Sequence, residues 1–164
     1  TGRKPAKKKE SAAEETAPLA SFGEAETTLV FYVVQRERQT WPVAQLHAVL
    51  QAAGLQFGDK RVYHCLKPYH EQTASVFLVA SMLEPGTLDP AEAAELHTFG
   101  LCLILHLPGP VPATAALNEA VLVLDVLSRE LDAEVWDSAR QPLTLEGLNA
   151  LHDQLMLKDK IAAF

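Results

Sequence analysis

The chain has 164 residues and a formal net charge of −7, and hydrophobic residues make up 48% of it. This composition predicts one globular domain with its own core, and no run approaches the roughly 20 apolar residues that a membrane helix needs. The charges of residues 1–26 cancel, so the net −7 lies on residues 27–164. An acidic domain repels phosphate backbones, which argues against nucleic acid as a partner.

The first 26 residues, TGRKPAKKKESAAEETAPLASFGEAE, predict a linker outside the core. They have few apolar residues and no periodicity, so they bury too little surface to offset the entropy of ordering, and we expect residues 1–26 to form a disordered charged linker. The KPAKKK run is compatible with contact to an anionic surface, but nothing amphipathic surrounds it, which favours a solvated linker. Because the sequence begins with threonine, we expect it to be part of a longer protein.

The first half of the domain predicts alternating strands and helices. The segment TTLVFYVVQ (27–35) is rich in β-branched and aromatic residues and predicts a strand. Residues 42–54 predict a helix with Gly54 at its C-cap. A turn at 58–60 leads to a strand over 61–66, and a further strand is predicted over 73–83. The turn at 84–87 contains Pro and Gly, after which Asp89 and Pro90 predict the start of a short helix over 90–97.

The second half predicts a strand at 100–108, a long helix at 112–131, a strand at 133–137 and a last helix capped by Thr144. The apolar positions of the long helix are so widely spread that both of its sides must be partly buried. Tight connections between the middle strands favour antiparallel pairing. The predicted fold class is therefore α+β, with residues 27–164 forming a mostly antiparallel β-sheet that has helices packed on one face.

Alternation along the three long strands separates two rows of side chains on each. The more uniform rows should face the helices: Leu29, Phe31, Val33, Phe77, Val79, Leu83, Leu101, Leu103, Leu105 and Leu107. The opposite rows are mixed but still largely apolar: Val30, Tyr32, Val34, Val76, Leu78, Ala80, Met82, Cys102, Ile104 and His106. A sheet with one face in water should alternate apolar and polar residues more cleanly. Either this face is covered by helices or by the tail, or it is an exposed apolar groove that docks a partner segment, and periodicity alone leaves both open.

The sequence lacks the motifs of catalytic chemistry. It has no G-x-S-x-G, P-loop, G-x-G-x-x-G or kinase pattern, and His64 and Cys65 are strand neighbours that point to opposite faces. We therefore predict that the domain is not an enzyme and uses no cofactor or small-molecule substrate. The histidine spacings predict no metal site, and Cys65 and Cys102 are expected to be packed, reduced thiols. An RNA-binding sheet is disfavoured because the open rows offer Tyr32 but otherwise mainly aliphatic residues.

Three stretches carry a family resemblance. In order and spacing, AGLQFGDKRVYH (53–64), SMLEPGTLDP (81–90) and GLCLILHLP (100–108) resemble the C-terminal domain of the bacterial cell-division protein ZipA. The resemblance implies an antiparallel sheet with a shallow apolar cavity opposite its helices, which binds the C-terminal tail of the division GTPase FtsZ. It also implies an inner-membrane helix upstream of this chain, so that the full-length protein tethers the division ring at the cytoplasmic face of the membrane while this fragment is soluble. A generic protein-interaction or oligomerisation domain with another peptide partner is the alternative.

The resemblance also implies a peptide-binding site. Matching the family's cavity-lining positions onto this chain gives Thr28, Val30, Lys60, Val62, Ala80, Met82, Cys102 and Ile104, with Arg140 at the rim. Alternation alone had already placed five of these on one face of the sheet: Val30, Ala80, Met82, Cys102 and Ile104.

The chain departs from the family pattern at four positions. The family pattern has methionine in place of Lys60, valine in place of Thr28, phenylalanine in place of Ile104 and a basic residue in place of Glu84. We therefore expect a smaller cavity floor and a differently charged rim.

Overall fold

The computed structural model describes residues 26–37 and 39–163, so the predicted linker lies almost entirely outside the described residues. The order of the elements is β1 (Thr27–Gln35), β2 (Trp41–Pro42), α1 (Val43–Ala52), β3 (Gln56–Gly58), the 3₁₀ turn η2 (Asp59–Arg61), β4 (Val62–Tyr69), β5 (Gln72–Ser81), the 3₁₀ helix η3 (Pro90–Glu95), β6 (His97–Thr98), β7 (Gly100–Leu107), α2 (Ala113–Leu131), β8 (Ala133–Trp136) and α3 (Leu145–Ala162). Within this part of the chain, no helix combines the length and apolarity needed to cross a membrane.

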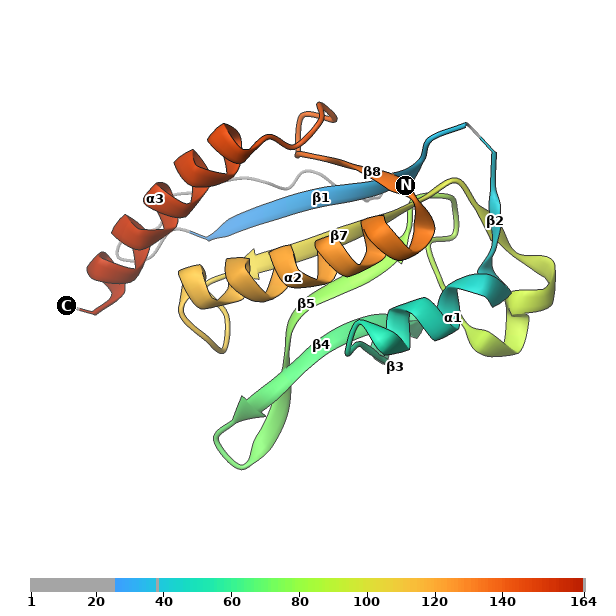
Figure 1. Ribbon diagram of the computed structural model, residues 1–164. Helices are drawn as coiled ribbons and strands as arrows, with labels where there is room; N and C mark the ends of the chain where they lie inside the picture. The colour runs from blue at the N-terminus through green and yellow to red at the C-terminus, as the bar shows by residue number, and fades with distance from the viewer. Residues whose placement is uncertain (1–25, 38, 164) are drawn as a thin grey trace, which may run out of the picture.

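The main sheet has six strands in the order β3-β4-β5-β7-β1-β8, and each neighbouring pair is antiparallel. Strands β2 and β6 form a separate two-stranded ladder. Helices α1 and α2 lie on the same side of the main sheet, and α3 packs against α2 (Figure 1). The α+β class with a mostly antiparallel sheet is therefore confirmed.

The core lies between this sheet and its helices. On β1 and β7 the side chains predicted to face the helices are buried almost completely, with Phe31 2% exposed, Val33 1% and Leu103 1%, except for Leu29 at the start of β1, which is partly buried. Leu46 and Leu50 of α1 and Leu117 and Leu127 of α2 close the core from the other side. Because alternate strand residues point to opposite faces, burying this row commits the intervening residues to the other side of the sheet.

The N-terminus of α2 is capped by a side chain from α3. Pro112 occupies the N-cap position of α2 and provides no side-chain hydrogen bond. Asp159 fills that role, because its Oδ1 accepts from the Ala113 N–H at 2.7 Å and its Oδ2 accepts from the Thr114 N–H at 3.0 Å and from Thr114 Oγ1 at 2.7 Å. A carboxylate at this position satisfies free amides and complements the helix dipole. Asp159 thereby joins the two long helices, and Leu155, one turn earlier, is buried beside them.

Two predictions about β5 are wrong. Leu83 was expected in the core, but β5 ends at Ser81 and Leu83 is 42% exposed in the turn that follows. Val76 was expected on the second face, but a bulge between the pairs Cys65–Phe77 and Leu66–Ser75 leaves Val76 without a partner. The extra residue breaks the alternation, and Val76 turns into the core at 3% exposure.

Candidate functional site

The sheet face opposite α1 and α2, here called the second face, carries two apolar rows that cross three strands. In the first row Ile104 of β7 pairs with Leu78 of β5 and with Val30 of β1. In the second row Cys102 pairs with Ala80 on one side and with Tyr32 on the other. Directly paired residues of an antiparallel sheet project from the same face, so these side chains form one continuous surface.

The second face is less buried than the first. Val30, Ala80, Met82, Cys102 and Ile104 are all partly buried, whereas Leu101, Leu103 and Leu105, which alternate with the latter two, are 0–1% exposed. This difference separates side chains that hold the fold together from side chains that are available for contact. The register thus brings together Val30, Ala80, Cys102 and Ile104, with Tyr32 and Leu78, all of which alternation placed on this face.

One end of this surface is fixed by contacts between β1 and its neighbours. Thr28 is exposed, and its Oγ1 lies 3.0 Å from Nδ1 of His106 on β7. Ser138, in the loop after β8, accepts a hydrogen bond from the Val30 N–H at 3.2 Å and donates one to the Val30 carbonyl at 2.8 Å. The Ser138 hydroxyl therefore pairs with the backbone N–H and carbonyl of Val30, a part of β1 that β8 does not reach. No local sequence pattern predicts this contact, because it joins residues 108 positions apart.

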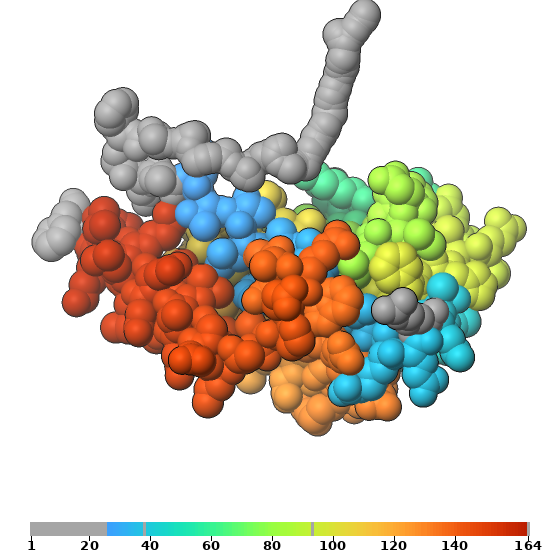
Figure 2. Space-filling model, turned by 90° about the horizontal axis from the view of Figure 1, so that it is seen from above, coloured from blue at the N-terminus to red at the C-terminus, as the bar shows by residue number. Residues whose placement is uncertain are grey.

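Arg140 lies over the second face, as a rim residue would. Its guanidinium carbon is 4.9 Å from the centre of the Tyr32 ring, within the range of a cation–π contact. Figure 2 shows the orange segment that contains β8 and the following loop next to the blue residues of β1. This placement leaves the exposed Arg140 charge beside the two apolar rows.

Met82 extends the surface past the end of β5. Its N–H donates to the Gly100 carbonyl of β7 at 2.9 Å, so the two segments stay in register beyond the strand. A Cβ atom at Gly100 would lie 2.5 Å from the Met82 sulfur and 3.0 Å from the Val33 carbonyl oxygen. The absence of a side chain at Gly100 is what allows Met82 to lie against the sheet.

Lys60 and Val62 lie at the far edge of the site and differ in exposure. Val62 begins β4 and is buried at 6% exposure, while Lys60 is exposed in the turn η2. Lys60 and Arg61 have φ values of 64° and 61°, in the left-handed region that side chains other than glycine rarely adopt. Tertiary contacts must therefore hold this turn in place.

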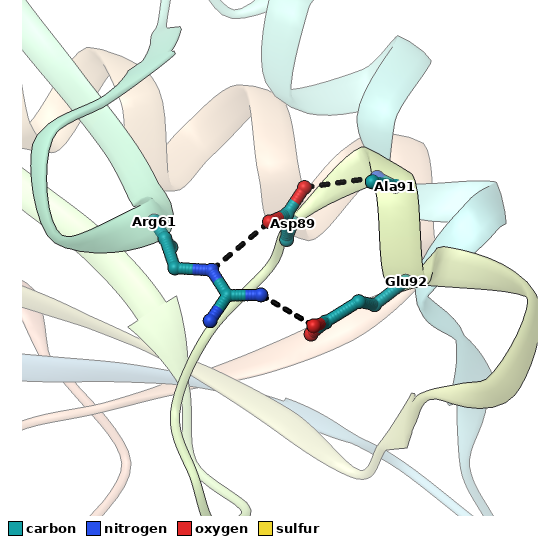
Figure 3. Close-up of polar contacts among 4 residues, drawn as sticks. All are labelled: Arg61, Asp89, Ala91 and Glu92. Carbon is teal, nitrogen blue, oxygen red and sulfur yellow. Dashed lines mark hydrogen bonds and ion pairs between the residues drawn. The ribbon is translucent and has the colours of Figure 1, made fainter.

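An ion-pair network supplies those contacts (Figure 3). Arg61 Nε donates to Asp89 Oδ2 at 2.9 Å, and Arg61 Nη2 donates to the Glu92 carboxylate. Two hydrogen bonds lower the pKa of Asp89 and keep its carboxylate ionised: the larger effect comes from the Ala91 N–H and the next from the Arg61 side chain. On the other side of the turn, His64 Nε2 donates to the Asp59 carbonyl at 2.7 Å. The PGT-x-DP segment thus braces the turn that carries Lys60.

Both cysteine thiols have raised pKa values. Desolvation raises the pKa of the Cys102 thiol to about 11, so it is protonated at neutral pH and behaves as a small apolar group. Burial raises the pKa of Cys65 as well. In residues 26–37 and 39–163, no group of three or more His, Cys, Asp and Glu side chains is placed to hold a metal ion.

Comparison with known proteins assigns the family. The model of the C-terminal FtsZ-binding domain of ZipA matches residues 27–154. The chain belongs to this family. It is 33% identical over 129 residues to the cell division protein ZipA of Marinobacter nauticus, covering 77% of this chain and 38% of that protein. It is 33% identical over 141 residues to ZipA of Shewanella amazonensis, covering 80% of this chain and 39% of that protein.

A more distant relative gives the same result. The chain is 30% identical over 112 residues to ZipA of Xanthomonas axonopodis pv. citri, covering 68% of this chain and 46% of that protein. The chain therefore spans less than half the length of the curated relatives that it matches. Both the family and its relatives are named for cell division or for binding to FtsZ, not for a reaction.

Proposed function

We propose that this domain is a non-catalytic adaptor that binds the C-terminal tail of FtsZ on the second face of its sheet. The site consists of Thr28, Val30, Lys60, Val62, Ala80, Met82, Cys102 and Ile104, with Arg140 at the rim. In the full-length protein, an N-terminal anchor upstream of this chain then links the division ring to the cytoplasmic face of the inner membrane. The binding requires no cofactor, nucleic acid or small-molecule substrate.

The observation that supports this proposal most strongly is the pair of apolar rows on the second face. The residues paired with Ile104 and Cys102 on β5 and β1 include no charged side chain, so both rows stay apolar across three strands. These rows stay partly exposed while the neighbouring rows are packed in the core. An apolar surface of this kind on a sheet is typical of docking sites for peptide segments, and the family is defined by binding to FtsZ.

The energetics fit a weak, exchangeable contact. Three or four apolar side chains of the tail, docked over Val30, Met82 and Ile104, would each contribute about 1.5–3 kcal/mol before costs. Ordering a flexible segment removes several kcal/mol of this gain. At the upper end of these contributions the remainder is on the order of −6 to −8 kcal/mol, which corresponds to micromolar binding. Because an FtsZ polymer presents many tails to many tethered domains, avidity supplies the holding strength.

The charges and the size of the side chains at this site determine which tail it favours. Lys60 places a cation at the edge of the surface, and Arg140 places a second one near Tyr32. Two cations beside the apolar rows favour a tail with carboxylates flanking its apolar residues. Ile104 has less area than an aromatic residue, so the floor of the site offers less apolar contact area at its centre.

The test is a titration of the domain with a fluorescently labelled FtsZ tail peptide, followed by anisotropy. The wild type should bind with a micromolar Kd, and Ile104→Glu should weaken binding at least tenfold. Leu122→Glu is the matched control, because it makes the same change in charge at a position on α2 that is 64% exposed. No binding by the wild type would favour another peptide partner, and equal losses in both variants would show that the effect is one of net charge.

A further inference from the structure

A cavity of about 460 Å³ lies where β1 leaves the sheet. Its walls come from the end of β1, the loop that follows, the residue before β7, and β8: Val34, Gln35, Arg36, Thr40, Phe99, Glu134 and Trp136. None of these residues belongs to the site proposed above. A volume of this size accommodates a large side chain with room to spare.

The register places this cavity on the second face. Val34 pairs with Glu134, and Tyr32 pairs with Trp136, so these four side chains project from the same side of the sheet. Tyr32 also pairs with Cys102 and therefore belongs to the second apolar row. The cavity is thus continuous with the apolar surface and extends it past Tyr32.

Three of the polar side chains that line the cavity, Arg36, Glu134 and Trp136, are held by hydrogen bonds and ion pairs. Trp136 Nε1 donates to Glu134 Oε1 at 3.1 Å. Arg36 lies 3.7 Å from the other Glu134 oxygen and 3.3 Å from Asp132, and it donates to the Ala133 carbonyl at 3.4 Å. The apolar lining that remains for an occupant consists of the rings of Phe99 and Trp136 and the side chain of Val34.

We propose that this cavity is a further subsite for the FtsZ tail, which takes one bulky apolar side chain between Trp136 and Phe99. The inference rests on the proposed function, because the occupant is another residue of the same peptide. Arg36 and Glu134 line the cavity, and Asp132 pairs with Arg36 beside it, so acidic groups outnumber basic ones in this cluster, which favours a basic residue next to that apolar anchor.

The spacing of the anchor follows from strand geometry. Val34 lies four residues after Val30 on β1, and a strand rises about 3.4 Å per residue, so the two positions are roughly 14 Å apart. A tail that runs extended along β1 covers this distance in about four residues. The anchor should therefore lie about four positions from the apolar residue that docks over Val30.

The experiment is an alanine scan of the FtsZ tail peptide against three forms of the domain. Thr40→Trp fills the cavity from an exposed rim position without removing a packed group. Gln39→Trp is the matched control, since it adds the same ring at the preceding exposed position, which does not line the cavity. We expect Thr40→Trp to weaken binding at least fivefold and Gln39→Trp to bind like the wild type. One apolar peptide position should lose affinity on alanine replacement in the wild type but not in Thr40→Trp.

Two outcomes separate this inference from the function on which it rests. If the wild type binds the tail and Ile104→Glu weakens binding, but Thr40→Trp binds like the wild type, the subsite is overturned and the adaptor function stands. If the wild type does not bind the tail, the subsite and the adaptor function are both overturned.

Trp136 fluorescence provides a second measurement. A shift of this fluorescence on binding, recorded in a Trp41→Phe background, would support the subsite, because the chain has only two tryptophans.

Discussion

Two adjacent residues of β7 provide the sharpest separation between fold and function. Leu103 is 1% exposed in the core, and Ile104 is partly buried on the second face. Replacing Leu103 with glutamate removes about 1.5–3 kcal/mol of apolar burial and adds several kcal/mol for an unpaired buried carboxylate. This sum approaches the roughly 5–15 kcal/mol that stabilises a typical domain, so Leu103→Glu should unfold the protein.

Ile104→Glu should do the opposite. Because Ile104 is only partly buried, its loss costs about 1 kcal/mol of folding free energy, and the carboxylate keeps its contact with water. The same substitution removes an apolar contact with the tail worth about 1.5–3 kcal/mol, which corresponds to a loss of affinity of about 10- to 100-fold.

Thermal melts followed by circular dichroism measure the first effect, and peptide anisotropy measures the second. Met82→Glu should behave as Ile104→Glu does. An unfolded Ile104→Glu variant, or a folded and stable Leu103→Glu variant, would refute the assignment of the two faces.

Three further predictions concern the elements that support the site. Asp159→Asn should destabilise the domain by about 1–2 kcal/mol at neutral pH. Burial by itself raises the pKa of Asp159, but the hydrogen bonds from Thr114 and from the first amides of α2 together outweigh it and lower this pKa. The stabilisation by Asp159 is therefore present above about pH 4 and is lost as the pH falls further. An equal acid dependence of stability in Asp159→Asn would contradict this. Gly100→Ala should displace Met82 and cost about 1–3 kcal/mol of stability, with weaker tail binding, and unchanged anisotropy titrations would count against the packing described. Arg61→Ala should speed amide hydrogen exchange in the turn η2 and leave the Tm almost unchanged, whereas unaltered exchange would show that the ion pairs do not brace this turn.

The features that could be read from the sequence are those that local periodicity determines. TTLVFYVVQ predicts β1 over 27–35 with the bounds it has in the structure, because β-branched and aromatic residues make up most of the segment. The long helix and its wide apolar pattern were predicted, and so was the N-cap of α3, where Thr144 Oγ1 accepts from the Gly147 N–H at 3.0 Å. The separation of Leu103 from Ile104 needed only the period of two in a strand.

The features that escaped prediction depend on contacts distant in sequence. Which strands pair is set by tertiary packing, so nothing local showed that β8 would bring Trp136 alongside Tyr32. The bulge at Val76 interrupts the alternation on which the prediction rested. The cap that Asp159 provides for α2 joins residues 45 and 46 positions apart and has no local sequence signature.

The binding face itself can be tested by chemical-shift mapping of the isotope-labelled domain with the FtsZ tail peptide. Backbone and methyl shifts should concentrate at Val30, Ala80, Met82 and Ile104, while Leu103 and the exposed face of α2 stay unchanged. Shifts confined to the helices, or no shifts with the peptide in large excess over a micromolar Kd, would contradict the proposal that the second face of the sheet binds the tail.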